Sequence, residues 1–201
     1  MDSSVVRSRS FDEAEVLAGA MHAFRRKGYF GVSIPELETA TGLSAGSIYN
    51  SFKDKRGIFL AAFEQYLLTV LERRIAEFAN PERQLSGLRQ LFLSLLREPD
   101  GGTFGCLITN SAIEFGADRG IAEPTFLKGF AILERLFRER LTAAKSSGGL
   151  RAGVTPKAEA AKLLALYQGT LVLIRGGYDQ RMIRLAIKSE FDNLEGSSHD
   201  A

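Results

Sequence analysis

The sequence predicts an all-α protein of about nine helices. Apolar residues recur at the three- and four-residue spacing of a helix face along most of the 201-residue chain. No stretch alternates apolar and polar residues as a half-buried strand does, and capping residues separate the periodic segments. A hydrophobic fraction of 45% beside 25% charged residues is sufficient to build a core, so the composition excludes a disordered chain.

Three short helices are expected at the N-terminal end. Ser10 with Glu13, and Ser33 with Glu36, have the spacing of a capping box, in which a hydroxyl and a carboxylate cap the first turn of a helix. Gly42 is free to adopt the positive φ that ends a helix. The expected helices cover residues 10–28, 33–40 and 44–50.

Longer helices account for the rest of the chain. Asp54 is expected to cap the first of them, and proline at the first helical position marks the starts at Pro81 and Pro156. Their expected ranges are 54–78, 81–98, 106–115, 124–144, 156–175 and 179–194, followed by a polar tail over 195–201.

Residues 33–55 have the pattern of a helix-turn-helix, because two short helices flank a three-residue turn that contains Gly42. Apolar side chains on both helices can pack them onto the first helix: Leu37, Leu43, Ile48 and Phe52. The start of the 44–50 helix then projects outward. We expect its backbone N–H groups at residues 44–47 to be unpaired and to favour a DNA phosphate. Judged on the turn alone, an ordinary αα-hairpin is an equally good interpretation.

The residue types of this helix suit a DNA major groove. Ala45 and Gly46 are short enough for close approach, and Asn50 can reach a base edge, most naturally that of adenine. Other side chains suit phosphate contacts: Ser44, Ser47, Tyr49, Lys53 and Lys55. Tyr49 has a second interpretation, in which its ring belongs partly to the core. The formal net charge is only +2, so DNA binding must depend on local placement of charge.

The same segment resembles the TetR family of one-component transcriptional regulators. Residues 20–29 and 33–55 carry the resemblance, which extends over about residues 10–66. Residues 42–55 fill every position of the family's diagnostic pattern, G-[VL]-S-x-G-[ST]-[LI]-Y-x-x-F-x-[DS]-K. One departure is Glu38, where many relatives carry a small residue. We expect Glu38 to point outward or to tilt the helix pair slightly.

The resemblance implies a dimer, in which residues 1–53 form an arm and a DNA-binding domain and residues 54–201 form a helical regulatory and dimerisation domain. It implies a repressor that binds a pseudo-palindromic operator in double-stranded DNA and is released by a small-molecule effector. Position by position, the residues expected to face bases are Ser44, Ala45, Gly46 and Asn50. Those expected to hold the DNA backbone are Ser33, Ser47, Tyr49, Lys53 and Lys55.

The helices at 156–175 and 179–194 are apolar on more than one face. A surface helix needs a single apolar stripe, so the surplus predicts a homodimer through these two helices. The alternative is a pair of central core helices.

An effector pocket is harder to place. The chain has 14 Phe and no Trp, so aromatic lining is available. The candidates are Phe92, Leu96, Phe104, Cys106, Asn110, Phe115, Phe130, Phe137, Tyr167, Leu171 and Arg175. Plain core is the alternative for the apolar residues, and Arg175 has a rival role in pairing with helix carbonyls or an acid. Cys106 is either a small buried residue or a sensor thiol whose pKa is lowered by a helix N-terminus.

Other function classes find little support. One cysteine and two distant histidines predict no disulfide and no metal site. The enzyme motifs GxGxxG, GxSxG, HExxH and Walker A are absent, so we expect no catalysis and no cofactor beyond an effector. The longest apolar run, 163–174, is too short for a membrane span, and the polar residues 1–10 lack a secretory signal. These observations favour a cytoplasmic protein. The remaining alternative is a helical ligand-binding or protein-interaction module without sequence-specific DNA binding.

Overall fold

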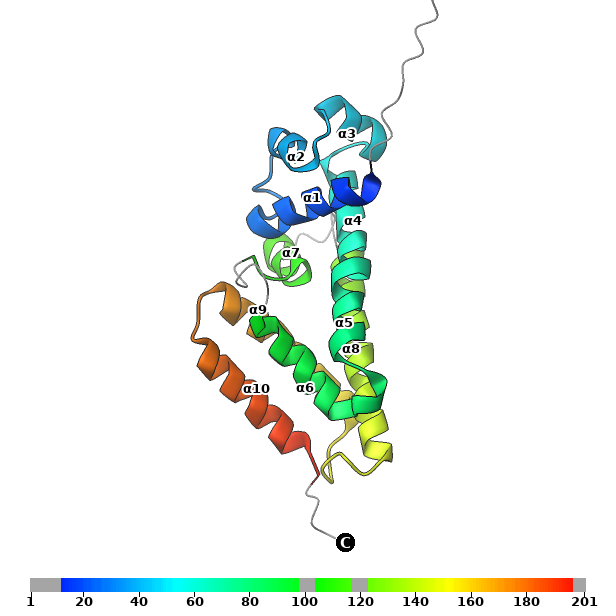
Figure 1. Ribbon diagram of the computed structural model, residues 1–201, viewed down its shortest axis with the longest axis vertical. Helices are drawn as coiled ribbons and strands as arrows, with labels where there is room; N and C mark the ends of the chain where they lie inside the picture. The colour runs from blue at the N-terminus through cyan, green and yellow to red at the C-terminus, as the bar shows by residue number, and fades with distance from the viewer. Residues whose placement is uncertain (1–11, 98–103, 117–122, 197–201) are drawn as a thin grey trace, which may run out of the picture. The chain divides into compact units, whose positions relative to one another are not determined.

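The computed structural model describes residues 12–97, 104–116 and 123–196 (Figure 1). Within these ranges the regular structure is helical, apart from an isolated bridge between Leu150 and Glu195. The chain divides into two compact units, Met1–Gln65 and Tyr66–Ala201. These units are defined by packing alone. The expected boundary between residues 53 and 54 divides the chain by function, so it stays a prediction.

The first unit holds three short helices and most of a fourth. They are α1 (Glu13–Lys27), α2 (Ile34–Thr41), α3 (Ala45–Phe52) and α4 (Lys55–Tyr66). Phe59 forms edge-to-face contacts with Phe24 and Phe63, with ring centroids 5.0 and 5.8 Å apart. Gly19 allows α1 and α2 to pack closely, because a Cβ atom there would lie 2.0 Å from the Ala40 carbonyl oxygen.

The structure confirms most of the predicted helix caps. Ser33 Oγ accepts from the Glu36 N–H (3.4 Å), while the Glu36 carboxylate accepts from the Ser33 N–H (2.7 Å), which completes the predicted capping box. Gly42 ends α2 with a φ of 71°. The start of α1 was predicted wrongly: Asp12 is its N-cap and accepts from the Ala14 N–H at 2.9 Å. Ser10 lies outside the described residues.

The helix predicted over 54–78 is present but not uniform. Asp54 caps it as expected, since its carboxylate accepts from the Gly57 N–H at 2.7 Å. After α4 the chain forms a π-helical segment, η1 (Leu67–Glu72), and then α5 (Arg73–Phe78). Counted as one helix, these three segments bring the α-helices of the described residues to the predicted nine.

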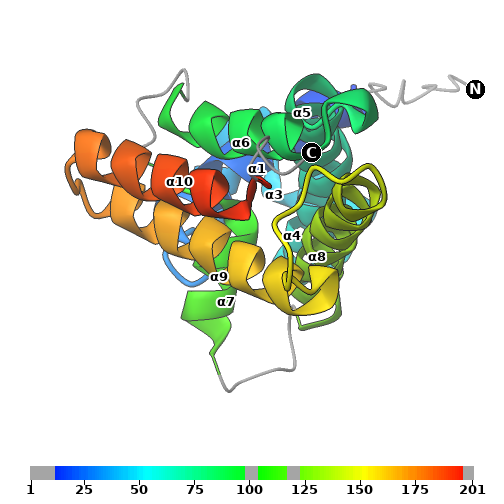
Figure 2. The same cartoon turned by 90° about the horizontal axis from the view of Figure 1, so that it is seen from below.

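The second unit holds an aromatic cluster and the remaining helices, whose arrangement Figures 1 and 2 show. They are α6 (Gln84–Ser94), α7 (Leu107–Phe115), α8 (Glu123–Ser146), α9 (Pro156–Arg175) and α10 (Gln180–Leu194), with short 3₁₀ turns η2 (Pro81–Arg83) and η3 (Leu95–Arg97). The Phe92 ring of α6 lies 5.2–5.6 Å, centroid to centroid, from Phe137, Tyr167 and Phe191 of three other helices. One buried ring thus joins α6, α8, α9 and α10.

The end of the second unit is better anchored than the predicted polar tail suggests. The Gly196 N–H donates to the Gly149 carbonyl (3.1 Å), and the Arg151 N–H donates to the Leu194 carbonyl (2.9 Å). Residues 195 and 196 therefore pair with the loop after α8. None of the helices in the described ranges combines the length and apolarity that a membrane span requires.

Candidate nucleic-acid interface and ligand pocket

Helix α3 exposes a face of small and polar residues. Ile48 is fully buried and fixes the inward direction of the helix. Gly46 and Asn50 each lie about 160° around the helix from Ile48, at the centre of the outward face. Both are exposed, and the Tyr49 side chain beside them is 48% exposed. The Tyr49 side chain is thus half-exposed, so both of its predicted roles, a phosphate contact and a ring that belongs partly to the core, stay predictions.

The N-terminal end of α3 differs from the expectation of unpaired N–H groups. Ser44 Oγ accepts from the Ser47 N–H (3.3 Å), and Glu38 Oε1 accepts from the Ala45 N–H (2.6 Å). The expectation is wrong for Ala45 and Ser47, because two side chains cap the helix before any ligand arrives. Glu38 does not point outward: it bridges α2 to α3 and places a negative charge at the end expected to meet phosphate.

The predicted phosphate-contacting residues lie around this helix, several with partners inside the first unit. Ser33 Oγ donates to Glu36 at 2.8 Å. Lys53 is exposed just after α3, in a left-handed conformation with φ of 73°. Lys55 Nζ lies 4.6 Å from the centroid of the Tyr29 ring. The pKa of Tyr29 is raised, mainly because its hydroxyl is partly buried. As DNA contacts, the nine residues from Ser33 to Lys55 stay predictions.

Most of the predicted effector-binding residues have structural roles in the second unit. Phe92, Phe137 and Tyr167 form the aromatic cluster. Three further candidates are buried, namely Leu96, Phe115 and Leu171. Cys106 is 5% exposed and its sulfur accepts a hydrogen bond from the Tyr66 hydroxyl at 3.1 Å. This burial fits the interpretation of Cys106 as a small core residue better than that of a sensor thiol.

The polar candidates meet at one carbonyl group. Asn110 Nδ2 and Arg175 Nη1 each donate to the Phe104 carbonyl oxygen at 2.8 Å. Gly105 follows with a φ of 70°, and a Cβ atom there would lie 3.0 Å from Asn110 Oδ1. These contacts tie the turn before α7 to the end of α9. Arg175 thus pairs with a carbonyl, although that carbonyl belongs to a turn rather than to a helix end.

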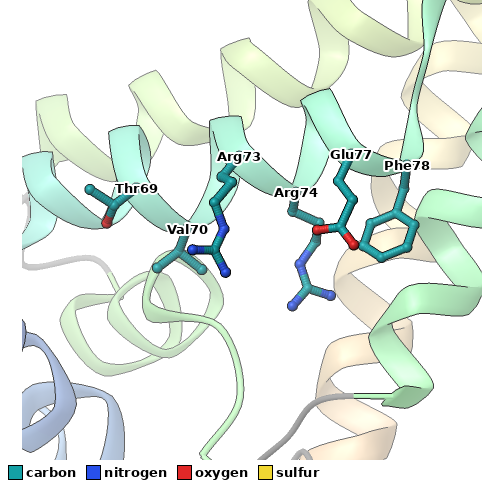
Figure 3. A pocket seen from close by; sticks show the side chains of 6 residues that line it. All are labelled: Thr69, Val70, Arg73, Arg74, Glu77 and Phe78. Carbon is teal, nitrogen blue, oxygen red and sulfur yellow. The ribbon is translucent and has the colours of Figure 1, made fainter.

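Two hollows in the second unit are large enough to hold a small molecule. One, of about 340 Å³, lies on α8 and α9 and includes Phe130 from the predicted set; its lining is Phe130, Glu134, Ala161, Leu164, Ala165 and Gln168. The other, of about 220 Å³, lies along η1 and α5 (Figure 3) and is lined by Thr69, Val70, Arg73, Arg74, Glu77 and Phe78. The sequence analysis did not predict this second set, although the adjacent Arg73 and Arg74, next to the apolar Leu71 and Ile75, were a visible signal.

Comparison with known proteins agrees with this architecture. A family model described as "Bacterial regulatory proteins, tetR family" matches residues 16–62, and one described as "Tetracyclin repressor-like, C-terminal domain" matches residues 81–189. The uncharacterized HTH-type transcriptional regulator YezE of Bacillus subtilis is 34% identical over 152 residues, which are 72% of this chain and 75% of YezE. The chain belongs to the tetR family.

Two further relatives cover more of the chain. The HTH-type transcriptional repressor ComR of Escherichia coli is 27% identical over 85% of this chain and 83% of its own. A solved structure of the TetR family regulator CifR, a cysteine mutant in complex with a 26-bp operator DNA, has a TM-score of 0.81 at 23% identity and covers 92% of this chain and 98% of that one. The CifR likeness shows the fold.

Family membership decides between the function classes left open by the sequence. The tetR-family protein is a DNA-binding transcriptional regulator rather than an enzyme. A helical module without DNA binding is no longer favoured, because the matched residues 16–62 cover most of α1, all of α2 and α3, and the first part of α4.

Proposed function

We propose that this tetR-family protein is a repressor that binds a pseudo-palindromic operator as a homodimer and leaves it when a small molecule binds in the second unit. The observation that carries the proposal is the exposed face of α3, with Gly46 and Asn50 opposite the buried Ile48. Two relatives are named as repressors, ComR of Escherichia coli and AcnR of Corynebacterium glutamicum. Access to chromosomal DNA requires that the protein work in the cytoplasm.

The α3 face suits a DNA groove because it combines short residues with one amide. A Cβ atom built on Gly46 would meet nothing nearer than Ser44 Oγ at 4.0 Å, so the fold itself does not require glycine there. Close approach to a ligand is therefore the better explanation for a glycine inside a helix. The exposed Asn50 amide both donates and accepts, which matches the major-groove edge of adenine.

Dimerisation is supported by apolar side chains that the second unit leaves exposed. They lie on α9, on α10 and on the turn between them: Val172, Leu173, Tyr178, Met182 and Leu185. Gly169 also lies on the exposed side of α9, and a Cβ atom there would meet nothing within 4 Å. Several large apolar side chains left exposed on two consecutive helices support a protein–protein interface. A twofold dimer presents two copies of α3, which read half-sites about one helical turn or more apart.

The effector part of the proposal rests on the hollows of the second unit. We propose that no metal or organic cofactor acts beyond the effector. Among the described residues, no cluster of three His, Cys, Asp or Glu side chains suits a metal ion. An effector that binds more tightly to the DNA-free arrangement of the dimer shifts the equilibrium of the protein away from the DNA-bound arrangement.

The proposal is tested by fluorescence anisotropy of the full-length protein with labelled duplex DNA from upstream of its own gene. We expect tight binding to this DNA and weak binding to a scrambled duplex. N50A should lose about tenfold or more in affinity and relax the preference at one base pair. S51A is the matched control, because Ser51 lies only about 60° from Ile48 and off the outward face. Equal binding of both duplexes by the wild-type protein overturns the proposal.

A further inference from the structure

We propose that the small molecule is an organic carboxylate with a short apolar part, and that the guanidinium groups of Arg73 and Arg74 hold its carboxylate in the hollow along η1 and α5. That the bound carboxylate acts as effector rests on the proposed function above. Binding itself depends only on the second unit.

The hollow is lined by residues from neighbouring turns of η1 and α5. Thr69 and Arg73, Val70 and Arg74 are pairs four residues apart on one side of the chain. Figure 3 shows the two guanidinium groups extending from the same side of the helix. The segment Leu67–Glu72 is π-helical, a form that is rare and is frequent at functional sites.

The charge of the hollow favours an anion. Its lining contains two arginines and one glutamate, so its formal charge is positive. Arg73 is exposed and forms no ion pair with any residue that the structure describes. An anionic ligand therefore does not have to displace a carboxylate from Arg73.

Arg74 is held in place from the neighbouring helix. Its Nη1 donates to Ser94 Oγ at 3.2 Å, and the Ser94 hydroxyl in turn donates to the Leu91 carbonyl at 2.7 Å. Ser94 is only 5% exposed, so this support is rigid. A half-buried guanidinium fixed in this way loses little further conformational entropy when it binds a ligand.

The charge of Arg74 also acts on the buried phenol of Tyr167. Burial raises the pKa of Tyr167 far above its ordinary value, and the charge of Arg74 lowers it in part. Tyr167 is thus protonated at neutral pH and close enough to Arg74 for their charges to interact.

Shape and size narrow the ligand class. The planar fork of arginine matches the two oxygens of a carboxylate. A volume of about 220 Å³ lies below the roughly 300–1,000 Å³ of drug-sized pockets, so the ligand is small. Val70 and Phe78 provide apolar contacts for a short hydrocarbon part.

The inference is tested by isothermal titration calorimetry of the full-length protein with benzoate and butyrate, each against its neutral amide, and with inorganic phosphate. We expect at least one acid to bind with a Kd of about 1 mM or lower, and about tenfold or more tighter than its amide. R73Q should weaken acid binding about tenfold or more. R135Q is the matched control, because Arg135 is an exposed residue of α8 whose side chain is 67% accessible.

Four results overturn the inference: neither acid binds at about 10 mM, an acid and its amide bind equally, R73Q binds acid like R135Q, or phosphate binds tighter than both acids.

Operator binding is measured in parallel to separate this failure from that of the repressor proposal. R73Q should bind the operator like the wild-type protein but need about tenfold more acid for release. Acid binding without release from DNA overturns the effector role. Operator binding without acid binding overturns only the ligand assignment.

Discussion

Helices α3 and α10 bury the same kind of side chain but expose opposite chemistry. Ile48 is the buried centre of α3, and Ile183 and Ile187 are buried on α10. The outward face of α3 carries Gly46 and Asn50, whereas that of α10 carries Met182 and Leu185 with 48% and 58% exposure. The apolar residues of the inward faces make both segments helices that pack against a core. Under the proposed function the outward faces set the partner, since hydrated polar groups suit DNA and apolar side chains suit another protein.

The strongest test of this contrast is a charge on the α10 face. L185E should convert the dimer to a monomer and lower operator affinity about 100-fold or more, because the two half-sites are no longer bound by one particle. Light scattering after size-exclusion chromatography measures the mass, and anisotropy measures the affinity.

Leu68 provides the matched control for that experiment. Its side chain is 59% exposed, against 58% for Leu185, but it lies on η1, away from the apolar residues of α9 and α10. L68E should stay dimeric and bind the operator normally. A dimeric L185E protein, or an equally monomeric L68E protein, contradicts the assignment of the α10 face.

A methyl group on the α3 face should separate stability from DNA binding. G46A should raise the free energy of unfolding by about 0.5–1 kcal/mol, because alanine is a better helix former and the site has open space. Under the proposed function the same methyl group lies on the surface that DNA approaches, so operator affinity should fall about tenfold. Urea denaturation and anisotropy measure the two effects. G46A binding DNA as well as S51A does would show that this face is not the contact surface.

A substitution of Glu38 can remove the charge at the start of α3 and keep the cap of that helix. E38Q should still accept the Ala45 N–H with its amide oxygen, while the repulsion of DNA phosphates disappears. We expect operator affinity to rise about threefold at low salt, and the gain to shrink as salt screens the charge. E72Q makes the same change in net charge on η1 and should have no such effect. Unchanged affinity in E38Q would mean that phosphates do not approach this helix end.

The smallest effect concerns the cap of α2, which supports the α3 face without belonging to it. The pKa of Glu36 is lowered to about 2, first by its hydrogen bond from Lys27 and then by those from Ser33. A lowered carboxyl pKa stabilises the fold above the unfolded value of about 4.3, and this contribution is lost as pH falls toward 2. The stability difference between wild type and E36Q in urea should therefore be largest near pH 6 and shrink below pH 4. A difference that is the same at pH 6 and pH 3 contradicts this ionic role.

Local sequence determined the elements that depend on neighbours a few residues away. The capping box of Ser33 and Glu36, the left-handed Gly42 and the cap at Asp54 all follow from bonds that span two to four residues. The outward position of Asn50 follows in the same way, because helical periodicity fixes it once Ile48 is buried. These features made the outward face of α3 predictable, together with the family resemblance.

Tertiary packing decided the contacts that join one element to another. The hydrogen bond from Ala45 to Glu38, the meeting of Asn110 and Arg175 at Phe104, and the support of Arg74 by Ser94 each join different elements. Their partners depend on how helices cross, and a periodic pattern gives the face of a helix but not the residue opposite it. For this reason the sequence determined which helices form and which face each exposes, whereas only the folded structure placed two arginines beside a hollow.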